Sequence, residues 1–131
     1  MSTWAPVIST VTLFVDDLAA TKQFYLAVFG LPVVFEDPDS AVFRFGPMQI
    51  NLLRSSQAGE LIEPAPVAPA SAGSRFQFTI EVDDVDAMVA ELTARGVAFL
   101  NGPIDRPWGV RTAAFSDPAG HVWEIAKGIA A

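Results

Sequence analysis

Two pairs of neighbouring carboxylates are the residues of this chain whose type and spacing first suggest chemistry. Asp16 and Asp17 form one pair, and Asp83 and Asp84 repeat it 67 residues later. Two carboxylates that share a site have separated pKa values, so one can act as an acid and the other as a base. Each pair here stands directly before a stretch with helical apolar spacing, where Asp commonly caps the helix and interacts favourably with its dipole. We therefore interpret both pairs as helix caps and assign no catalysis to them.

Few other side chains offer reactive groups. The chain has no cysteine, which excludes disulfides, thiolate metal ligands and a cysteine nucleophile. Its single histidine, His121, follows a turn sequence, and we expect a surface turn residue there. Trp108 stands between proline and glycine, and its flat ring either stacks on a planar ligand or covers the end of the core. Arg111 either binds an anionic ligand group or pairs with a carboxylate of the chain.

The composition excludes several classes of partner. The net charge of −7 disfavours binding to nucleic acids and to anionic membranes, and it either attracts cationic molecules or serves solubility. The sequence has no glycine-rich phosphate loop and no serine nucleophile elbow. No apolar run approaches the ~20 residues of a membrane span, and the first residues lack the features of a secretion signal. We therefore expect a cytoplasmic protein.

An internal repeat encodes the elements that position these residues. The segment Thr12–Leu18 returns as Thr79–Val85, and a long repeat indicates one supersecondary unit used twice. In each copy an alternating strand leads into the repeated segment, and a helical stretch follows and closes with glycine. The predicted order is β-α-β-β-β in residues 7–54, a proline-rich extended linker in 55–73, and β-α-β-β-β in 74–127, with a loop at 101–109.

Alternation along the strands separates two faces of each predicted sheet. One face is apolar and must carry the helices, whereas the other mixes polar and apolar side chains. A mixed face either meets solvent or lines a small-molecule cavity. The repeat favours the cavity, because two related sheets would curl toward each other around a cleft.

The chain resembles the glyoxalase / bleomycin-resistance / extradiol-dioxygenase superfamily, also called vicinal oxygen chelate proteins. The segments that carry the resemblance are residues 11–18 with 24–25 and 29–31, the repeat at 79–85, and residues 107–111 with 117–124. The resemblance implies an α+β fold in which residues 1–131 form a single domain, with two tandem βαβββ modules that build a curved mixed sheet around a cleft. It also implies a homodimer whose cleft is formed within one chain or shared between two.

The resemblance also implies positions for metal ligands. Metal-dependent members take His, Glu or Gln from the first, fourth, fifth and eighth strands, which correspond here to Thr10, Asn51, Gln77 and Glu124. Only Glu124 supplies the anionic oxygen that a hard divalent ion prefers, and no imidazole is present at these positions. We expect no metal cofactor, with a divalent ion at Glu124 as the alternative.

Glu124 has two interpretations. It either accepts hydrogen bonds from Gln77 and Asn51 in a closed network, or it faces a ligand and pairs with a cationic or donor group. We expect a metal-independent binder of a small planar or cationic molecule such as an antibiotic. The alternatives are a lyase, isomerase or dioxygenase-like enzyme that uses Glu124 as a base, with or without a divalent metal, and an accessory module with a vestigial pocket. The candidate ligand-binding residues are Thr10, Asn51, Gln77, Trp108, Arg111 and Glu124.

Overall fold

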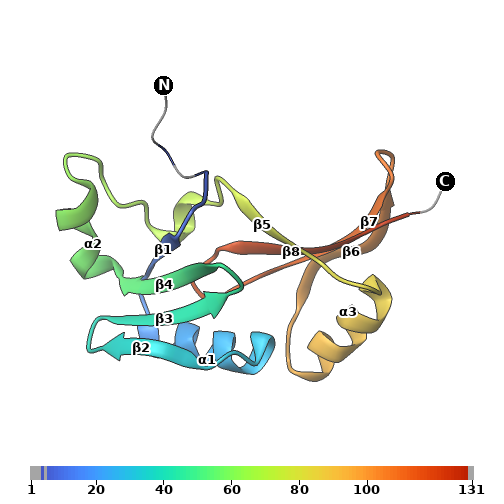
Figure 1. The fold of residues 1–131 in the computed structure, drawn as a ribbon, viewed down its shortest axis with the longest axis horizontal. Helices are drawn as coiled ribbons and strands as arrows, with labels where there is room; N and C mark the ends of the chain where they lie inside the picture. The colour runs from blue at the N-terminus through green and yellow to red at the C-terminus, as the bar shows by residue number, and fades with distance from the viewer. Residues whose placement is uncertain (1–3, 5, 130–131) are drawn as a thin grey trace. The chain divides into compact units, whose positions relative to one another are not determined.

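The computed structural model describes residue 4 and residues 6–129 of the chain (Figure 1). These residues fall into two compact units, one ending at Ala68 and the other beginning at Pro69. Each unit contains a four-stranded mixed sheet with an α-helix on one face, so the α+β class and the repeated β-α-β-β-β order are confirmed. Among the helices that the structure describes, none combines the length and the apolar character that crossing a membrane requires.

The first unit orders its strands β1-β4-β3-β2. Strand β1 runs parallel to β4, and the other neighbouring strands are antiparallel. Helix α1 covers the face on which Leu13, Phe43 and Leu52 are buried, and its Tyr25 is fully buried there with its ring centroid 5.6 Å from that of Phe43. The elements are β1 (Thr10–Val15), α1 (Leu18–Phe29), β2 (Val33–Asp37), β3 (Ser40–Phe45), β4 (Met48–Arg54) and α2 (Ser55–Ile62).

The second unit repeats this arrangement with the strand order β5-β8-β7-β6. Strands β5 and β8 are parallel, and the remaining pairs are antiparallel. Phe115, Trp123 and Ile125 are buried on the helix side. The elements are the 3₁₀-helix η1 (Ala70–Ala72), β5 (Gln77–Glu81), α3 (Val85–Ala94), β6 (Phe99–Arg106), β7 (Val110–Ser116) and β8 (Val122–Gly128).

The second aspartate of each carboxylate pair caps a helix, as predicted. One Asp17 carboxylate oxygen accepts a hydrogen bond from the backbone N–H of Ala20 at 3.0 Å, and Asp84 accepts the equivalent bond from Ala87 at 3.0 Å. Each bond satisfies a backbone donor that the first helical turn leaves unpaired. Helix α1 ends at Phe29 and is followed by its C-cap residue Gly30, whose φ of 65° is left-handed.

Two segments differ from the sequence-based prediction. Residues 55–62 form helix α2 rather than an extended linker, because the prolines that block a helix begin only at Pro64. Residues 101–106 continue strand β6 rather than forming a loop. The strand is irregular there, and an ideal Cβ on Gly102 would lie 2.4 Å from the Thr112 carbonyl oxygen, so only glycine fits. The Gly-Pro sequence at 102–103 marks a strand irregularity, although it is also typical of a turn.

Candidate functional site

The face of each sheet that points away from its helix carries a matched pair of polar residues. We call it the open face. In the first unit Thr12 lies opposite Asn51 across the parallel β1–β4 pair. In the second unit Thr79 lies opposite Glu124 across β5–β8. Thr12 and Thr79 are separated by the repeat offset of 67 residues, so the two units place a threonine beside a polar fourth-strand residue at the same location.

The pair in the second unit is joined by a good hydrogen bond. The Thr79 hydroxyl donates to Glu124 Oε1 at 2.9 Å, and Glu124 is half-buried. Ionised, a carboxylate only accepts hydrogen bonds and has room for several. Glu124 therefore retains the capacity to accept hydrogen bonds from a ligand.

The pair in the first unit leaves an acceptor without a partner. The Asn51 amide nitrogen donates to Thr12 Oγ1 over 3.5 Å, which is a long bond. The Asn51 side-chain oxygen is buried, and no residue that the structure describes donates a hydrogen bond to it. A buried polar atom left in this state costs about 1–3 kcal/mol, so it calls for an explanation.

One of the two interpretations of Glu124 made Gln77 a hydrogen-bond donor to it, but the described contacts give Thr79 that role. Gln77 lies opposite Val122, two residues from the position facing Glu124, and both Gln77 and Thr10 are exposed. Thr79 makes the hydrogen bond instead. A signal was present in the sequence, because Thr79 repeats Thr12 and shares the open face with Gln77.

Trp108 does not cover the end of the core. It lies in the turn between β6 and β7, and 71% of its surface is exposed. The covering role considered for it is therefore wrong. The ring presents an apolar plane at the hairpin tip, and its contact with a planar ligand stays a prediction.

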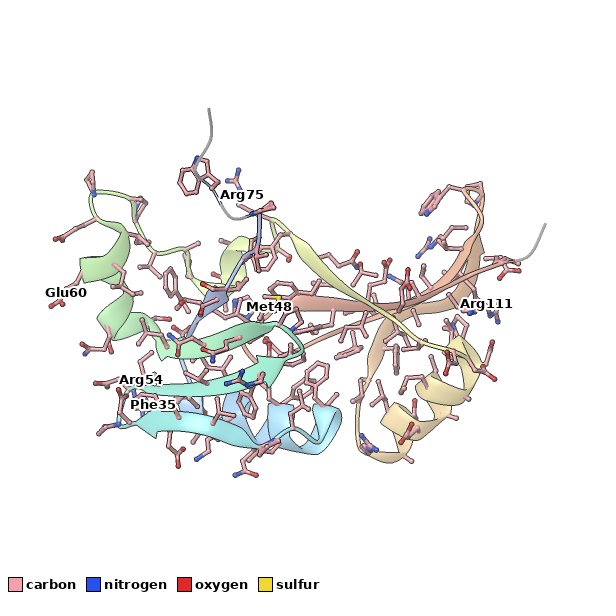
Figure 2. The ribbon with its side chains drawn as sticks, in the orientation of Figure 1. Phe35, Met48, Arg54, Glu60, Arg75 and Arg111 are labelled. Carbon is pink, nitrogen blue, oxygen red and sulfur yellow. The ribbon has the colours of Figure 1, made fainter. Side chains whose placement is uncertain are left out.

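Arg111 makes ion pairs on the helix side of its sheet (Figure 2). Its Nε and Nη2 donate to the two carboxylate oxygens of Asp86 on α3 at 2.8 and 2.9 Å, and its Nη1 donates to Asp105 at 2.8 Å. These bonds raise the pKa of Arg111, and the Arg111 hydrogen bond holds the pKa of Asp86 below its ordinary value. Of the two interpretations of Arg111, pairing with the chain's own carboxylates is the one that the structure shows.

His121 lies in the β7–β8 turn, as expected, but its side chain is only 15% exposed. Its Nδ1 is 3.1 Å from Asp117 Oδ2, and Asp117 Oδ1 accepts hydrogen bonds from the backbone N–H groups of Ala119 and His121. Asp117 is itself buried. The contacts of Asp117 with His121 and with the two backbone N–H groups therefore hold the β7–β8 turn together.

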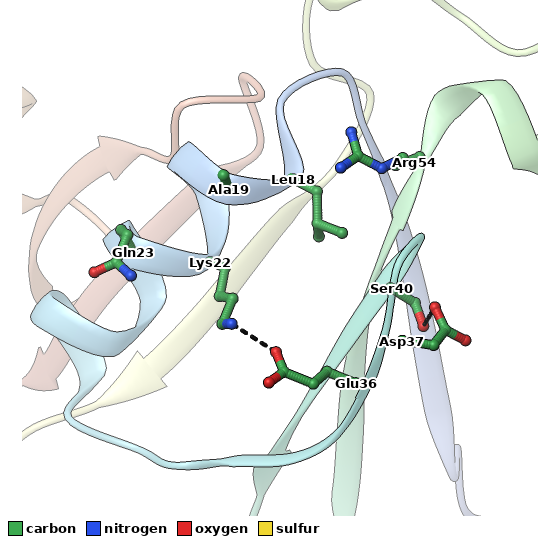
Figure 3. Close-up of a pocket in the computed structure, with 8 residues that line it drawn as sticks. All are labelled: Leu18, Ala19, Lys22, Gln23, Glu36, Asp37, Ser40 and Arg54. Atoms are coloured by element: carbon green, nitrogen blue, oxygen red, sulfur yellow. Dashed lines mark hydrogen bonds and ion pairs between the residues drawn. The ribbon is translucent and has the colours of Figure 1, made fainter.

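Two hollows lie away from the open faces. One, of about 210 Å³, lies beside α1 and β2, where Lys22 pairs with Glu36 and Asp37 accepts from the Ser40 hydroxyl (Figure 3). The other, of about 390 Å³, surrounds the Arg111–Asp86 pair. In both hollows oppositely charged side chains already pair with each other. The buried Asn51 oxygen, by contrast, lacks a hydrogen-bond donor among the described residues, so it is the stronger indication of a ligand.

The model of the Glyoxalase/Bleomycin resistance protein/Dioxygenase superfamily matches residues 7–125. The chain belongs to this superfamily. The resemblance that the sequence motifs indicated is thereby confirmed.

Solved structures of superfamily members share the fold. A glyoxalase/bleomycin resistance protein/dioxygenase from Nocardioides is 26% identical, with a TM-score of 0.86 over 98% of this chain and 87% of that one. Lactoylglutathione lyase from Agrobacterium tumefaciens is 26% identical, with a TM-score of 0.76 over 95% of each chain. TnmS3, an antibiotic binding protein from Streptomyces sp. CB03234, is 25% identical, with a TM-score of 0.72 over 97% of this chain and 99% of that one.

The metal chemistry of the glyoxalase superfamily does not fit the donors of the two matched pairs. Among the residues with described positions, no group of three His, Cys, Asp or Glu side chains is placed to hold a metal ion. The matched pairs supply one carboxylate, from Glu124, together with hydroxyls and a neutral amide. Hard divalent ions favour several anionic oxygens, and zinc or iron favours imidazole or thiolate.

Proposed function

We propose that this member of the glyoxalase superfamily binds a small organic molecule that bears a cationic or hydrogen-bond-donating group, and that it does so without a metal. The observation that carries the proposal is the buried Asn51 side-chain oxygen, which has no donor among the described residues. A ligand that supplies the missing donor would explain this atom, because binding then removes the cost of an unpaired acceptor.

Charge supports the same class of ligand. Glu124 on the other open face is also an acceptor, with one hydrogen bond from Thr79. The net charge of −7 raises the local concentration of cationic molecules around the protein. The exposed Trp108 ring is available for stacking on a planar ligand. An antibiotic that is planar or cationic fits this description, and one structural relative is an antibiotic binding protein.

A thermal-shift screen against planar and cationic antibiotics, with and without EDTA, tests the proposal. A ligand present at about 100 times its Kd stabilises the folded state by about 2.7 kcal/mol. We expect a compound that raises Tm equally in both buffers. The shift should be lost in Asn51→Leu and kept in the control Gln49→Leu, which removes an amide from the same face of the same strand. Stabilisation by a metal that EDTA reverses would contradict the proposal.

A second candidate function is a lyase or isomerase in which Glu124 acts as a general base. Its support is the half-buried Glu124 carboxylate on the open face, together with the 26% identity to a lactoylglutathione lyase. Consumption of lactoylglutathione by the wild type, lost in Glu124→Gln while binding persists, would favour this candidate. Absence of turnover with the antibiotic shift intact would favour the binding protein.

We also propose that the protein is a homodimer, because the superfamily resemblance implies one. Light scattering during size-exclusion chromatography measures the mass directly. A mass near the 14.0 kDa of one chain would contradict this assembly.

A further inference from the structure

The β6–β7 hairpin differs from its counterpart in the first unit at a matched position. Ser40 lies opposite Leu53, which is two residues after Asn51 on β4. Thr112 lies opposite Ala126, which is two residues after Glu124 on β8. Both hydroxyl residues are buried. In the first unit the chain turns directly before Ser40, whereas β7 begins two residues before Thr112. The longer hairpin brings an arginine, Arg106, back toward the open face.

The charge beside the hydroxyl is reversed between the units. In the first unit the Ser40 hydroxyl donates to the carboxylate of Asp37 at 2.9 Å. In the second unit the guanidinium Nε of Arg106 donates to Thr112 Oγ1 at 3.0 Å. Both units therefore keep the hydroxyl, but its charged partner comes from different places: Asp37 lies directly opposite Ser40, whereas Arg106 lies two residues beyond Ile104, the residue opposite Thr112.

Arg106 bonds only to neutral oxygens among the residues that the structure describes. Besides Thr112, it donates from Nη2 to the side-chain oxygen of Asn101 at 3.2 Å. Arg54 and Arg111, by contrast, each face a carboxylate. Arg106 is half-buried, and a partly desolvated charge without a counter-ion favours an anionic partner. Its remaining N–H donors form the planar fork that matches a carboxylate.

Arg106 and Glu124 lie on the same face of the second sheet. Thr112, which holds the guanidinium, lies opposite Ala126, and Glu124 lies opposite Ala114. Thr112 and Glu124 are therefore diagonal neighbours across β7 and β8, about 7–8 Å apart. The two alanines that complete this quartet, Ala114 and Ala126, carry only methyl groups and are buried. Within the described part of the chain, no ion pair joins Arg106 to Glu124, so both charges are available to a ligand.

We propose that Arg106 and Glu124 form a bipolar ligand site, in which Arg106 binds a carboxylate and Glu124 binds an ammonium or other cationic donor group of the same molecule. This inference rests on the proposed function and narrows it: the ligand class is a small zwitterionic amine-carboxylate rather than a simple cation. Each end of such a ligand forms a charge-assisted hydrogen bond, and the two ends together fix its direction on the sheet.

Three probes of similar size separate the two ends of the site: 4-(aminomethyl)benzoate, benzoate and benzylamine. Each is titrated into ¹⁵N-labelled protein at low salt, and binding is followed from the backbone amides of β6, β7 and β8. For wild type, we expect the zwitterion to bind about tenfold more tightly than either single-ended probe. Arg106→Gln should lower affinity for the zwitterion and benzoate about tenfold and spare benzylamine, whereas Glu124→Gln should spare benzoate.

Two further variants guard against indirect effects. Lys127→Gln removes one positive charge from the same sheet but on its helix side, opposite Arg111, and should change none of the affinities. Arg106→Lys keeps the charge without the fork and should recover part of the lost benzoate affinity. The spectrum of each variant reports whether it is folded.

The outcomes distinguish this site from the proposed function. Zwitterion and benzoate affinities that do not respond to Arg106→Gln refute the bipolar site, while benzylamine binding that depends on Glu124 would still support a cation-binding protein. Absence of binding by all three probes also refutes the bipolar site. In that case the proposed function is judged by the antibiotic screen and its Asn51→Leu control, which do not involve Arg106.

Discussion

Replacing Asn51 with leucine should stabilise the ligand-free protein while abolishing ligand binding. Leucine is close to asparagine in shape, and it removes the buried side-chain oxygen that has no donor among the described residues. Removal of an unpaired buried acceptor recovers about 1–3 kcal/mol. The substitution also loses the Asn51–Thr12 hydrogen bond, but at 3.5 Å this bond is worth less than the usual ~1 kcal/mol. The expected net gain is therefore about 1 kcal/mol.

Chemical denaturation of the ligand-free protein measures this gain. For 131 residues unfolding cooperatively, about 1 kcal/mol corresponds to a Tm increase of about 4 °C. Gln49→Leu is the matched control, because it makes the same exchange on the same face without removing a buried unpaired atom, and its stability should change by less than about 0.5 kcal/mol.

A loss of stability in Asn51→Leu would refute the reasoning. It would mean that the amide oxygen already accepts a hydrogen bond in the free protein, so that the atom needs no ligand to explain it. A gain in stability with unchanged ligand binding would separate the two claims: the oxygen would be unpaired, but it would not be part of the site. Only the gain combined with lost binding supports the functional interpretation of Asn51.

Three further predictions concern the second unit. Arg111→Gln should lower stability at neutral pH, and the loss should shrink as the pH falls below about 3.8. The pKa of Asp86 is depressed in the folded protein, so the ion pair stabilises the fold above that pH and stops doing so as Asp86 is protonated in acid. Urea titrations of both proteins across this pH range measure the difference in stability. Asp84→Ala removes the cap of α3 and should cost about 1 kcal/mol in the same assay. Gly102→Ala forces a side chain against the Thr112 carbonyl at a φ of 86° and should cost about 2 kcal/mol or more, seen as lost soluble expression or a lower Tm.

The repeated architecture was predictable because its signals are local. A threonine-to-aspartate motif at the end of a strand, a cap and a closing glycine specify a strand–helix unit wherever they occur, and they occur twice. The side chains that face away from the helices were also predictable, since alternation in a strand leaves no choice of face. Helix α2 was missed because the proline-rich half of the segment 55–73 dominated the interpretation of the whole.

The strand register that decides which side chain of the open face meets Glu124 was not predictable. Alternation places Gln77 and Thr79 on the same face, but nothing local decides which of them meets Glu124, because that depends on the register between two strands that are 45 residues apart at the contact. Arg106 was missed for a related reason. Its position follows from strand pairing through an irregular stretch around Gly102, whose sequence is typical of a loop.

The divergence between the two units carries more functional information than their likeness. Matched positions hold Asn51 in one unit and Glu124 in the other. The nearby hydroxyl residue bonds to an anion in the first unit, where Ser40 donates to Asp37, and to a cation in the second, where Thr112 accepts from Arg106. Asn51 and Glu124 differ in charge at positions with the same backbone pairing, whereas Asp37 and Arg106 come from different positions of their hairpins. Selection for folding alone would not require charge to differ at positions whose backbone environment is shared. A ligand whose ends differ chemically would require such a difference, and this is the reason to test zwitterions before simple cations.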